Sequence, residues 1–157
     1  MATKTNAVRL VQQAQIPCRE SFYEYDEKDL NGNHAAAAIG MPGEQVFKTL
    51  VARGERSGIH VFCIPVCCEL DLKKAAKAAG DKNMEMVAVK DLLNLTGYIR
   101  GGCSPVGMKK KYPTWIDETA QLWDEIAVSA GARGHQMILP PLPLAELINA
   151  KFVDIIL

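Results

Sequence analysis

Residues 46–65 read VFKTLVARGERSGIHVFCIP and give the clearest indication of the fold. The two ends, VFKTLVA at 46–52 and IHVFCIP at 59–65, are apolar and rich in β-branched and aromatic residues, and the polar segment RGERSG at 53–58 joins them. Two such runs separated by a short segment that contains glycine are typical of a β-hairpin. The sequence therefore predicts two antiparallel strands here.

Helical and strand patterns alternate on both sides of this hairpin. The helices are expected after Thr3 or Thr5, from Asn33 to Gly40, from Asp71 to Gly80, from 89 to Gly97 and at 143–149. Further strands are expected at 19–25, 114–117, 125–130, 135–139 and 152–156. Many strands with interspersed helices indicate an α+β fold with a mixed, largely antiparallel sheet. A chain of 157 residues is long enough for one domain, which we expect to span residues 1–157.

The composition limits the partners and the compartment. Lys+Arg and Asp+Glu are both 18, so a nucleic-acid partner needs a local basic patch rather than a basic molecule. An odd count of five cysteines without an apolar export signal predicts reduced thiols in a cytoplasmic protein. Cys63, Cys67 and Cys68 do not have the usual spacing of zinc ligands, so no metal is expected.

The common enzyme signatures are absent from the sequence, including the nucleophile elbow, the phosphate-binding loops and the zinc-protease motif. His34, His60 and His135 are scattered and are interpreted as surface or strand residues. One unusual feature is Lys48, which interrupts an apolar strand and shares a face with Val46 and Leu50 under a period of two. Two interpretations stay open: a lysine at a sheet edge, or a positive charge at a cleft for a phosphate or an oxyanion.

A second unusual feature is the segment GYIRGGCSPVGMKKK at 97–111. The pair Gly101-Gly102 lets backbone N–H groups approach a ligand, and Lys109, Lys110 and Lys111 follow as a rim that could bind phosphate groups. The alternative is a solvated loop with no ligand. The loop SAGARG at 129–134 has a similar small-residue character.

Five segments occur together in the order of a known family. They are FKTL at 47–50, LDLKKAAKAAG at 70–80, TGYIRGGCSPVGMKK at 96–110, VSAGARG at 128–134 and FVDI at 152–155. With these segments the chain resembles the YbaK family, which is similar to the inserted editing domain of bacterial prolyl-tRNA synthetase. The resemblance implies a single barrel-like sheet surrounded by helices.

The resemblance also implies an activity. YbaK-type proteins remove cysteine from mischarged tRNA(Pro) in trans, by a cyclisation in which the cysteine sulfur attacks its own ester and leaves as a thiolactone. It implies tRNA(Pro) as substrate, prolyl-tRNA synthetase as a partner, and no cofactor or metal. Two other functions stay open: a water-dependent deacylase for Ala-tRNA(Pro) or another small amino acid, and a non-catalytic tRNA- or synthetase-binding module that uses the lysines at 73–77 and 109–111.

The site residues implied by the resemblance fall on named positions of this chain. The family's essential lysine falls on Lys48, and its backbone glycine site falls on Gly101, next to Gly102. Tyr25, Thr49 and Ser129 match further substrate-pocket positions. The family more often has a glycine where this chain has Ala130.

Overall fold

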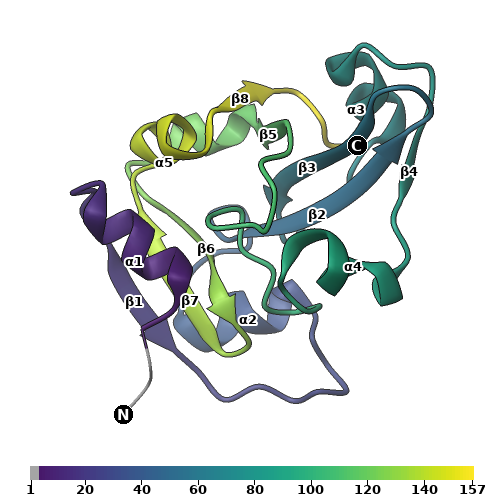
Figure 1. Cartoon of the computed structure of the whole chain (residues 1–157). Helices are drawn as coiled ribbons and strands as arrows, with labels where there is room; N and C mark the ends of the chain where they lie inside the picture. Colours follow the sequence, from purple (N-terminus) through teal and green to yellow (C-terminus); the bar gives the residue numbers. More distant parts are fainter. Residues whose placement is uncertain (1–3) are drawn as a thin grey trace.

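The computed structural model describes residues 4–157, which form two β-sheets with five α-helices and one 3-10 helix around them (Figure 1). The helices are α1 (Asn6–Gln13), α2 (Gly32–Ile39), α3 (Leu72–Ala79), α4 (Val89–Thr96), η1 (Glu118–Leu122) and α5 (Pro141–Ile148). The strands are β1 (Arg19–Phe22), β2 (Phe47–Gly54), β3 (Gly58–Pro65), β4 (Met84–Met86), β5 (Thr114–Asp117), β6 (Ile126–Ala132), β7 (His135–Leu139) and β8 (Ala150–Val153).

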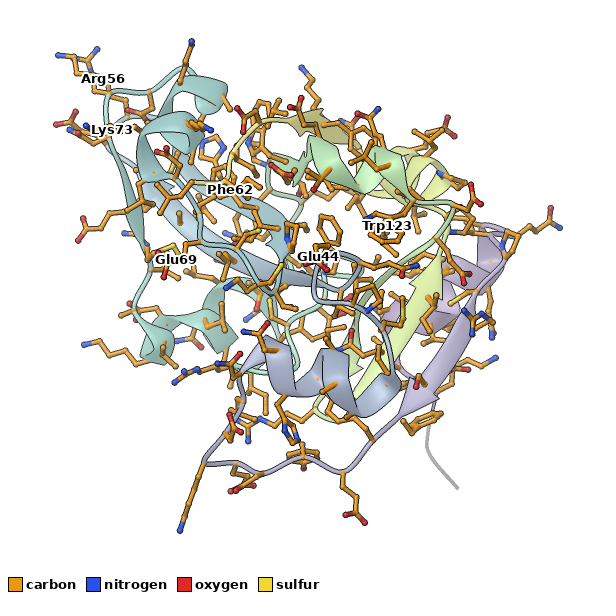
Figure 2. All side chains as sticks on the ribbon, turned by 180° about the vertical axis from the view of Figure 1, so that it is seen from behind. Glu44, Arg56, Phe62, Glu69, Lys73 and Trp123 are labelled. Carbon is orange, nitrogen blue, oxygen red and sulfur yellow. The ribbon has the colours of Figure 1, made fainter. Side chains whose placement is uncertain are left out.

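The predicted hairpin is confirmed and forms the middle of the larger sheet. Strands β2 and β3 pair antiparallel over their whole length, from Phe47 opposite Pro65 to Gly54 opposite Gly58. The sheet has the order β4-β2-β3-β5-β8, and β5 and β8 join it in parallel. One face is covered by α3, where Phe62 is fully buried in a cluster with Ala75. Figure 2 shows Phe62 in the interior and Lys73, on the exposed side of α3, projecting outward.

The smaller sheet has the antiparallel order β1-β7-β6, and helix α1 packs on it. Val8 and Val11 of α1 are buried in one cluster with Val128 and Met137. Because apolar surface leaves water at this interface, the amphipathic helix is held on the sheet.

The two sheets meet at a bridge between Val46 and Ala127, where the Ala127 N–H donates to the Gln45 carbonyl at 3.0 Å. The α+β class and the mixed, largely antiparallel pairing are confirmed. The single barrel-like sheet is not: within residues 4–157 the strands form two sheets and no closed barrel. The physical reason is that β2 pairs with β3 along its full length, whereas β6 pairs with β2 at no residue of the strand. The two sheets are joined only by the bridge at Val46, which lies just before β2 begins.

The helix boundaries follow the capping residues, with small differences from expectation. Thr5 accepts the Val8 N–H at 3.2 Å, and Thr3 lies outside the described residues. Asn31, not Asn33, caps α2, since its side chain accepts the Asn33 N–H at 2.8 Å. Strand β1 ends at Phe22, and β8 begins at Ala150. No helix in the described part of the chain is long and apolar enough to cross a membrane.

Candidate functional site

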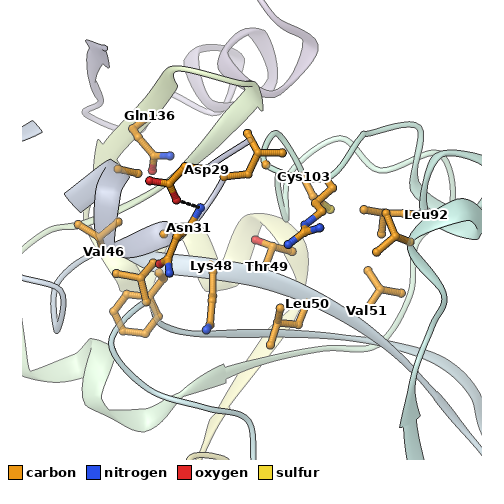
Figure 3. Close-up of a pocket in the computed structure, with 18 of the residues that line it drawn as sticks. Asp29, Asn31, Val46, Lys48, Thr49, Leu50, Val51, Leu92, Cys103 and Gln136 are labelled. Carbon is orange, nitrogen blue, oxygen red and sulfur yellow. Dashed lines mark hydrogen bonds between the residues drawn. The ribbon is translucent and has the colours of Figure 1, made fainter. Parts of the chain in front are cut away.

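A cavity of about 500 Å³ lies beside strand β2 (Figure 3). Strand β4 pairs with β2 only through Ala52, Arg53 and Gly54, so within residues 4–157 no strand pairs with the outer edge of β2 between 47 and 51. The segment before α2, the start of α4 and the loop at 100–103 surround this edge and line the cavity. The free strand edge thus becomes a wall of a cleft.

Lys48 lines this cavity and is half-buried. Figure 3 shows Lys48 and Thr49 projecting from opposite sides of β2, as a period of two requires. No salt bridge to Lys48 occurs within the described chain. The two interpretations of Lys48 therefore coincide, because the sheet edge that carries it is also the cleft, and its ammonium group is available to an anionic ligand.

Gly101 also lines the cavity, whereas Gly102 supports the loop from behind. Gly101 has a φ of +86°, and a Cβ there would stand 3.0 Å from Leu30 Cδ2. A Cβ on Gly102 would stand 3.0 Å from the backbone nitrogen of Arg133, so Gly102 lets this loop pack on the β6–β7 turn. Only glycine adopts the Gly101 conformation without strain, which places a side-chain-free backbone at the cavity wall.

Of the three other expected substrate-pocket residues, one lines the cavity and two lie outside its lining. Thr49 lines the cavity, with its Oγ1 3.9 Å from Cys63 Sγ. Ser129 is buried outside the lining, and its hydroxyl accepts the Gly131 N–H at 3.1 Å. Tyr25 is exposed and lies at an adjoining depression that also touches Gly101, while Tyr23 occupies the main cavity.

The lysine rim is separate from the cavity lining. Lys109, Lys110 and Lys111 are exposed, and none of them lines the cavity. The basic side chains that do line it are Lys28, Lys48 and Arg100. A polyanion bound over the cavity mouth would thus meet positive charge without those three consecutive lysines.

Several lining residues were not anticipated from the sequence. Asp29 and Asn31 lie in the segment that leads into α2, and the Asp29 carboxylate accepts the Asn31 N–H at 3.4 Å. Gln136 reaches the cavity from β7. The sequence of the first segment, DEKDLNGN, indicates a polar loop and carries no signal for a site.

The thiols near the cavity are held in the protonated form. Burial raises the pKa of the Cys103 thiol, which lines the cavity, to about 11. Burial likewise raises the pKa of Cys63 to about 12. Within the described residues, neither a histidine nor a serine lines the cavity. The site therefore lacks an activated nucleophile of its own at neutral pH.

A serine, a histidine and a carboxylate do meet elsewhere, at the hairpin turn, but in an order that does not activate the serine. Ser57 Oγ donates to Asp81 at 2.6 Å and lies 2.7 Å from His60 Nε2. Trp115 Nε1 donates to His60 Nδ1 at 3.2 Å, and since the indole can only donate, the His60 proton sits on Nε2 and points at Ser57. The Ser57 hydroxyl hydrogen bond holds the pKa of Asp81 well below its usual range. This cluster locks the turn to the end of α3.

No group of three or more metal-binding side chains that could hold an ion occurs in residues 4–157. Cys67 and Cys68 have their sulfur atoms 3.8 Å apart, without a third ligand.

Comparison with known proteins matches residues 32–147 to the aminoacyl-tRNA editing domain. The chain is 47% identical to a protein of Enterococcus faecalis named "Putative Cys-tRNA(Pro)/Cys-tRNA(Cys) deacylase EbsC", over 97% of this chain and 93% of that protein. It is 24% identical to YwhH of Bacillus subtilis, over 84% of each.

A solved structure has the same fold. The crystal structure of "a putative trans-editing enzyme for prolyl tRNA synthetase" superposes with a TM-score of 0.80 at 25% identity, over 99% of each chain. The family model spans well over half of the sequence and includes Lys48 and Gly101. The chain therefore belongs to the aminoacyl-tRNA editing family, among the proteins of the YbaK type.

Proposed function

We propose that this protein is a trans-editing deacylase that removes cysteine from mischarged tRNA(Pro). Membership of the editing family supports the reaction class, and the 47% identity to the E. faecalis protein supports cysteine as the amino acid. The name of that relative also includes Cys-tRNA(Cys), which we take as the second tRNA to test.

The observation that carries the mechanism is the absence of an activated nucleophile in the cavity lining of the described chain. Its one thiol, Cys103, has a pKa raised to about 11. A cysteinyl ester brings a thiol with a pKa of about 8.5, so a few per cent of it is thiolate at neutral pH. The substrate is the better source of the nucleophile.

In the proposed step the substrate thiolate attacks its own ester carbonyl carbon. The carbon–oxygen bond to the ribose then breaks, the ribose oxygen takes up a proton, and a four-membered thiolactone leaves. Water later opens the thiolactone to free cysteine. The tRNA is released with its 3′-terminal ribose intact.

The protein's part in this step is to position and to stabilise charge. The backbone at Gly101 lies close to the carbonyl, and Lys48 holds the terminal phosphate or ribose. Holding the thiolate and the carbonyl together contributes about 7–11 kcal/mol in favourable intramolecular cases. A single backbone donor to the developing oxyanion contributes about 2.7–4 kcal/mol. Thr49 shapes the wall beside these groups.

The remaining expected residues take outer roles in this proposal. Gly102 and Ser129 hold the two loops together, and Tyr25 stands at the rim. Lys109, Lys110 and Lys111 contact tRNA phosphates away from the cavity, which is consistent with their exposure. Prolyl-tRNA synthetase is proposed as a partner that passes on the mischarged tRNA, because the protein of the similar crystal structure is described as a trans-editing enzyme for that synthetase.

The test is a deacylation panel with Cys-tRNA(Pro), Cys-tRNA(Cys) and Ala-tRNA(Pro). We expect fast loss of cysteine from tRNA(Pro) and slow loss of alanine. Faster loss of alanine than of cysteine would replace the proposal with a water-dependent deacylase. Tight tRNA binding without loss of any ester would replace it with a non-catalytic binding module.

A further inference from the structure

Two neighbouring thiols lie at a turn outside the cavity lining. Cys67 is exposed, Cys68 is half-buried, and their sulfur atoms are 3.8 Å apart. The function proposed above uses neither thiol. Two thiols in contact can react together with one two-electron oxidant, because the second thiol attacks the sulfur that the oxidant has modified. The pair is therefore a candidate site of reversible oxidation.

The two thiols differ in the way that such a reaction requires. The exposed sulfur of Cys67 is open to an oxidant that arrives from solvent. Burial, and after it the hydrogen bond with the Cys67 thiol, raises the pKa of Cys68, which makes Cys68 the poorer first nucleophile. Cys68 nevertheless lies in contact with the Cys67 sulfur and is placed to attack it in a second step.

The peptide bond between the two cysteines also closes the chain turn that follows β3. The Cys68 N–H donates to the Pro65 carbonyl at 3.0 Å. A disulfide between adjacent residues forms a small ring that contains this peptide bond. Adjacent Cα atoms are about 3.8 Å apart across a trans peptide, which is closer than the usual separation of about 4.4–6.8 Å in a disulfide. We therefore expect ring closure to strain this peptide and to break the turn hydrogen bond.

The same turn carries Val66, which connects it to the cavity wall. Val66 is buried, lines the cavity and packs in one cluster with Ala36 of α2. Its side chain fills the space beside Gly32, where an added Cβ would stand 2.5 Å from Val66 Cγ1. Gly32 is the first residue of α2 and, like the capping residue Asn31, lines the cavity. A change in the turn is thus passed to the start of α2.

We propose that Cys67 and Cys68 form a vicinal dithiol that hydrogen peroxide oxidises to a disulfide, and that this disulfide lowers the deacylase activity through Val66. The Cys67 sulfur attacks one peroxide oxygen, the O–O bond breaks, and a sulfenic acid and one water form. The Cys68 sulfur then attacks the Cys67 sulfur, the S–O bond breaks, and a second water leaves. Two electrons pass from the sulfur atoms to the peroxide, and the two thiol protons end in the two waters.

Such a disulfide is readily reversed. A strained or exposed disulfide has a more oxidising potential than a structural one, so a thiol reductant opens it again. The effect on activity rests on the proposed function, whereas the formation of the disulfide does not.

The experiment treats the whole protein with hydrogen peroxide and then removes the peroxide with catalase, so that the thiol of the substrate is not oxidised. After denaturation and alkylation, tandem mass spectrometry should show that Cys67 and Cys68 have together lost two hydrogens and carry no alkyl group. Hydrogen exchange in residues 32–39 and 65–68 should become about 2- to 10-fold faster, as for one lost hydrogen bond. The value of kcat/KM for Cys-tRNA(Pro) should fall about 10-fold or more, because a misplacement of about 1 Å at a substrate-positioning wall can cost about 100-fold. Dithiothreitol should restore all three properties.

The variants test whether this pair makes the difference. Cys67→Ser and Cys68→Ser should each deacylate like the unchanged protein and should keep that activity after peroxide treatment. In Cys68→Ser the oxidation should stop at a sulfenic acid on Cys67, which dimedone traps. The matched control is Cys18→Ser, which removes a half-buried thiol just before β1. It should form the disulfide and lose activity like the unchanged protein.

Peroxide treatment that leaves both thiols free, or that instead links Cys67 of two protein copies, would overturn the oxidation site. A disulfide that forms without a change in exchange or activity would overturn the connection through Val66. An equal loss of activity in Cys67→Ser would assign the effect to another residue and would also overturn the inference. If the untreated protein never deacylates Cys-tRNA(Pro) but still forms the disulfide and shows the faster exchange, the proposed function fails and the oxidation site stands.

Discussion

Replacing Lys48 by methionine removes a charge and keeps most of the side-chain volume. Lys48 is half-buried at the cavity and has no salt bridge in residues 4–157, so its charge is available to the substrate in the folded protein. Lys48→Met should therefore leave the fold nearly unchanged. We expect a change in unfolding free energy within about 0.5 kcal/mol.

The expected loss of activity follows from the same geometry. A hydrogen bond to a charged group contributes about 1.5–3 kcal/mol, which corresponds to about 10- to 150-fold in kcat/KM. The Coulomb energy of two unit charges 4 Å apart near a protein surface is about 4 kcal/mol, or roughly 900-fold, which is an upper limit that the loss should not exceed. We expect kcat/KM for Cys-tRNA(Pro) to decrease by about 10- to 150-fold.

The assay is single-turnover deacylation of Cys-tRNA(Pro), with thermal unfolding of the same preparations. Lys151→Met is the matched control, because Lys151 is exposed on β8 at the opposite edge of the same sheet. That variant should deacylate like the unchanged protein. A folded Lys48→Met protein with unchanged kcat/KM would refute the role given to Lys48.

Three further predictions concern single residues. Gly101→Ala should lose activity and, because φ is +86° there, also about 2–8 °C in melting temperature. The control is Gly40→Ala, where φ is +73° and no atom lies near the added Cβ; this variant should lose stability but keep its activity. Cys103→Ser should keep its deacylation rate, and complete loss of activity in a folded variant would instead make Cys103 a nucleophile. Because the pKa of Cys103 is raised to about 11, its thiol should react with iodoacetamide at pH 8 much more slowly than the exposed Cys67, as mass spectrometry can show. Burial lowers the pKa of His60, so its neutral form stabilises the fold above about pH 6.5, and that contribution is lost as the pH falls through the lowered pKa. His60→Gln should therefore flatten the decrease in melting temperature between pH 7 and pH 5. An unchanged slope of melting temperature against pH would contradict this.

Much of the local structure could be predicted from the sequence because local chemistry determines it. The two apolar runs in residues 46–65, joined by a polar segment with glycine, predicted the hairpin, and Gly80 and Gly97 marked the ends of α3 and α4. Lys48 was notable because a charged residue in an apolar strand needs a cleft or an edge. The structure provides both at one place.

The arrangement of the sheets could not be read in the same way. A period of two tells which side chains share a face, but it does not tell which strand lies next to which. The β-type runs around Ile126 and His135 therefore gave no sign that they pair with β1 in a second sheet, joined to the first at Val46.

The far wall of the cavity depends on that second sheet. Gln136 reaches the cavity only because β7 lies between β1 and β6, and Asp29 reaches it through the loop that follows β1. Neither position has a local motif. Ser129 was expected in the pocket, but its hydroxyl bonds to the Gly131 N–H two residues later, a local contact that competes with a ligand.

The most direct test of the mechanism is to identify the first product released from Cys-tRNA(Pro), together with the rates for Cys-, Ser- and Ala-tRNA(Pro). Side-chain size alone would separate such near neighbours by only about 1–3 kcal/mol. If the substrate thiol is the nucleophile, rapid-quench mass spectrometry should detect cysteine thiolactone before free cysteine. The serine and alanine esters should also react more slowly than the cysteine ester, by a factor larger than side-chain size alone can produce. Free cysteine as the first product, with no thiolactone before it and with comparable rates for cysteine and alanine, would contradict the account.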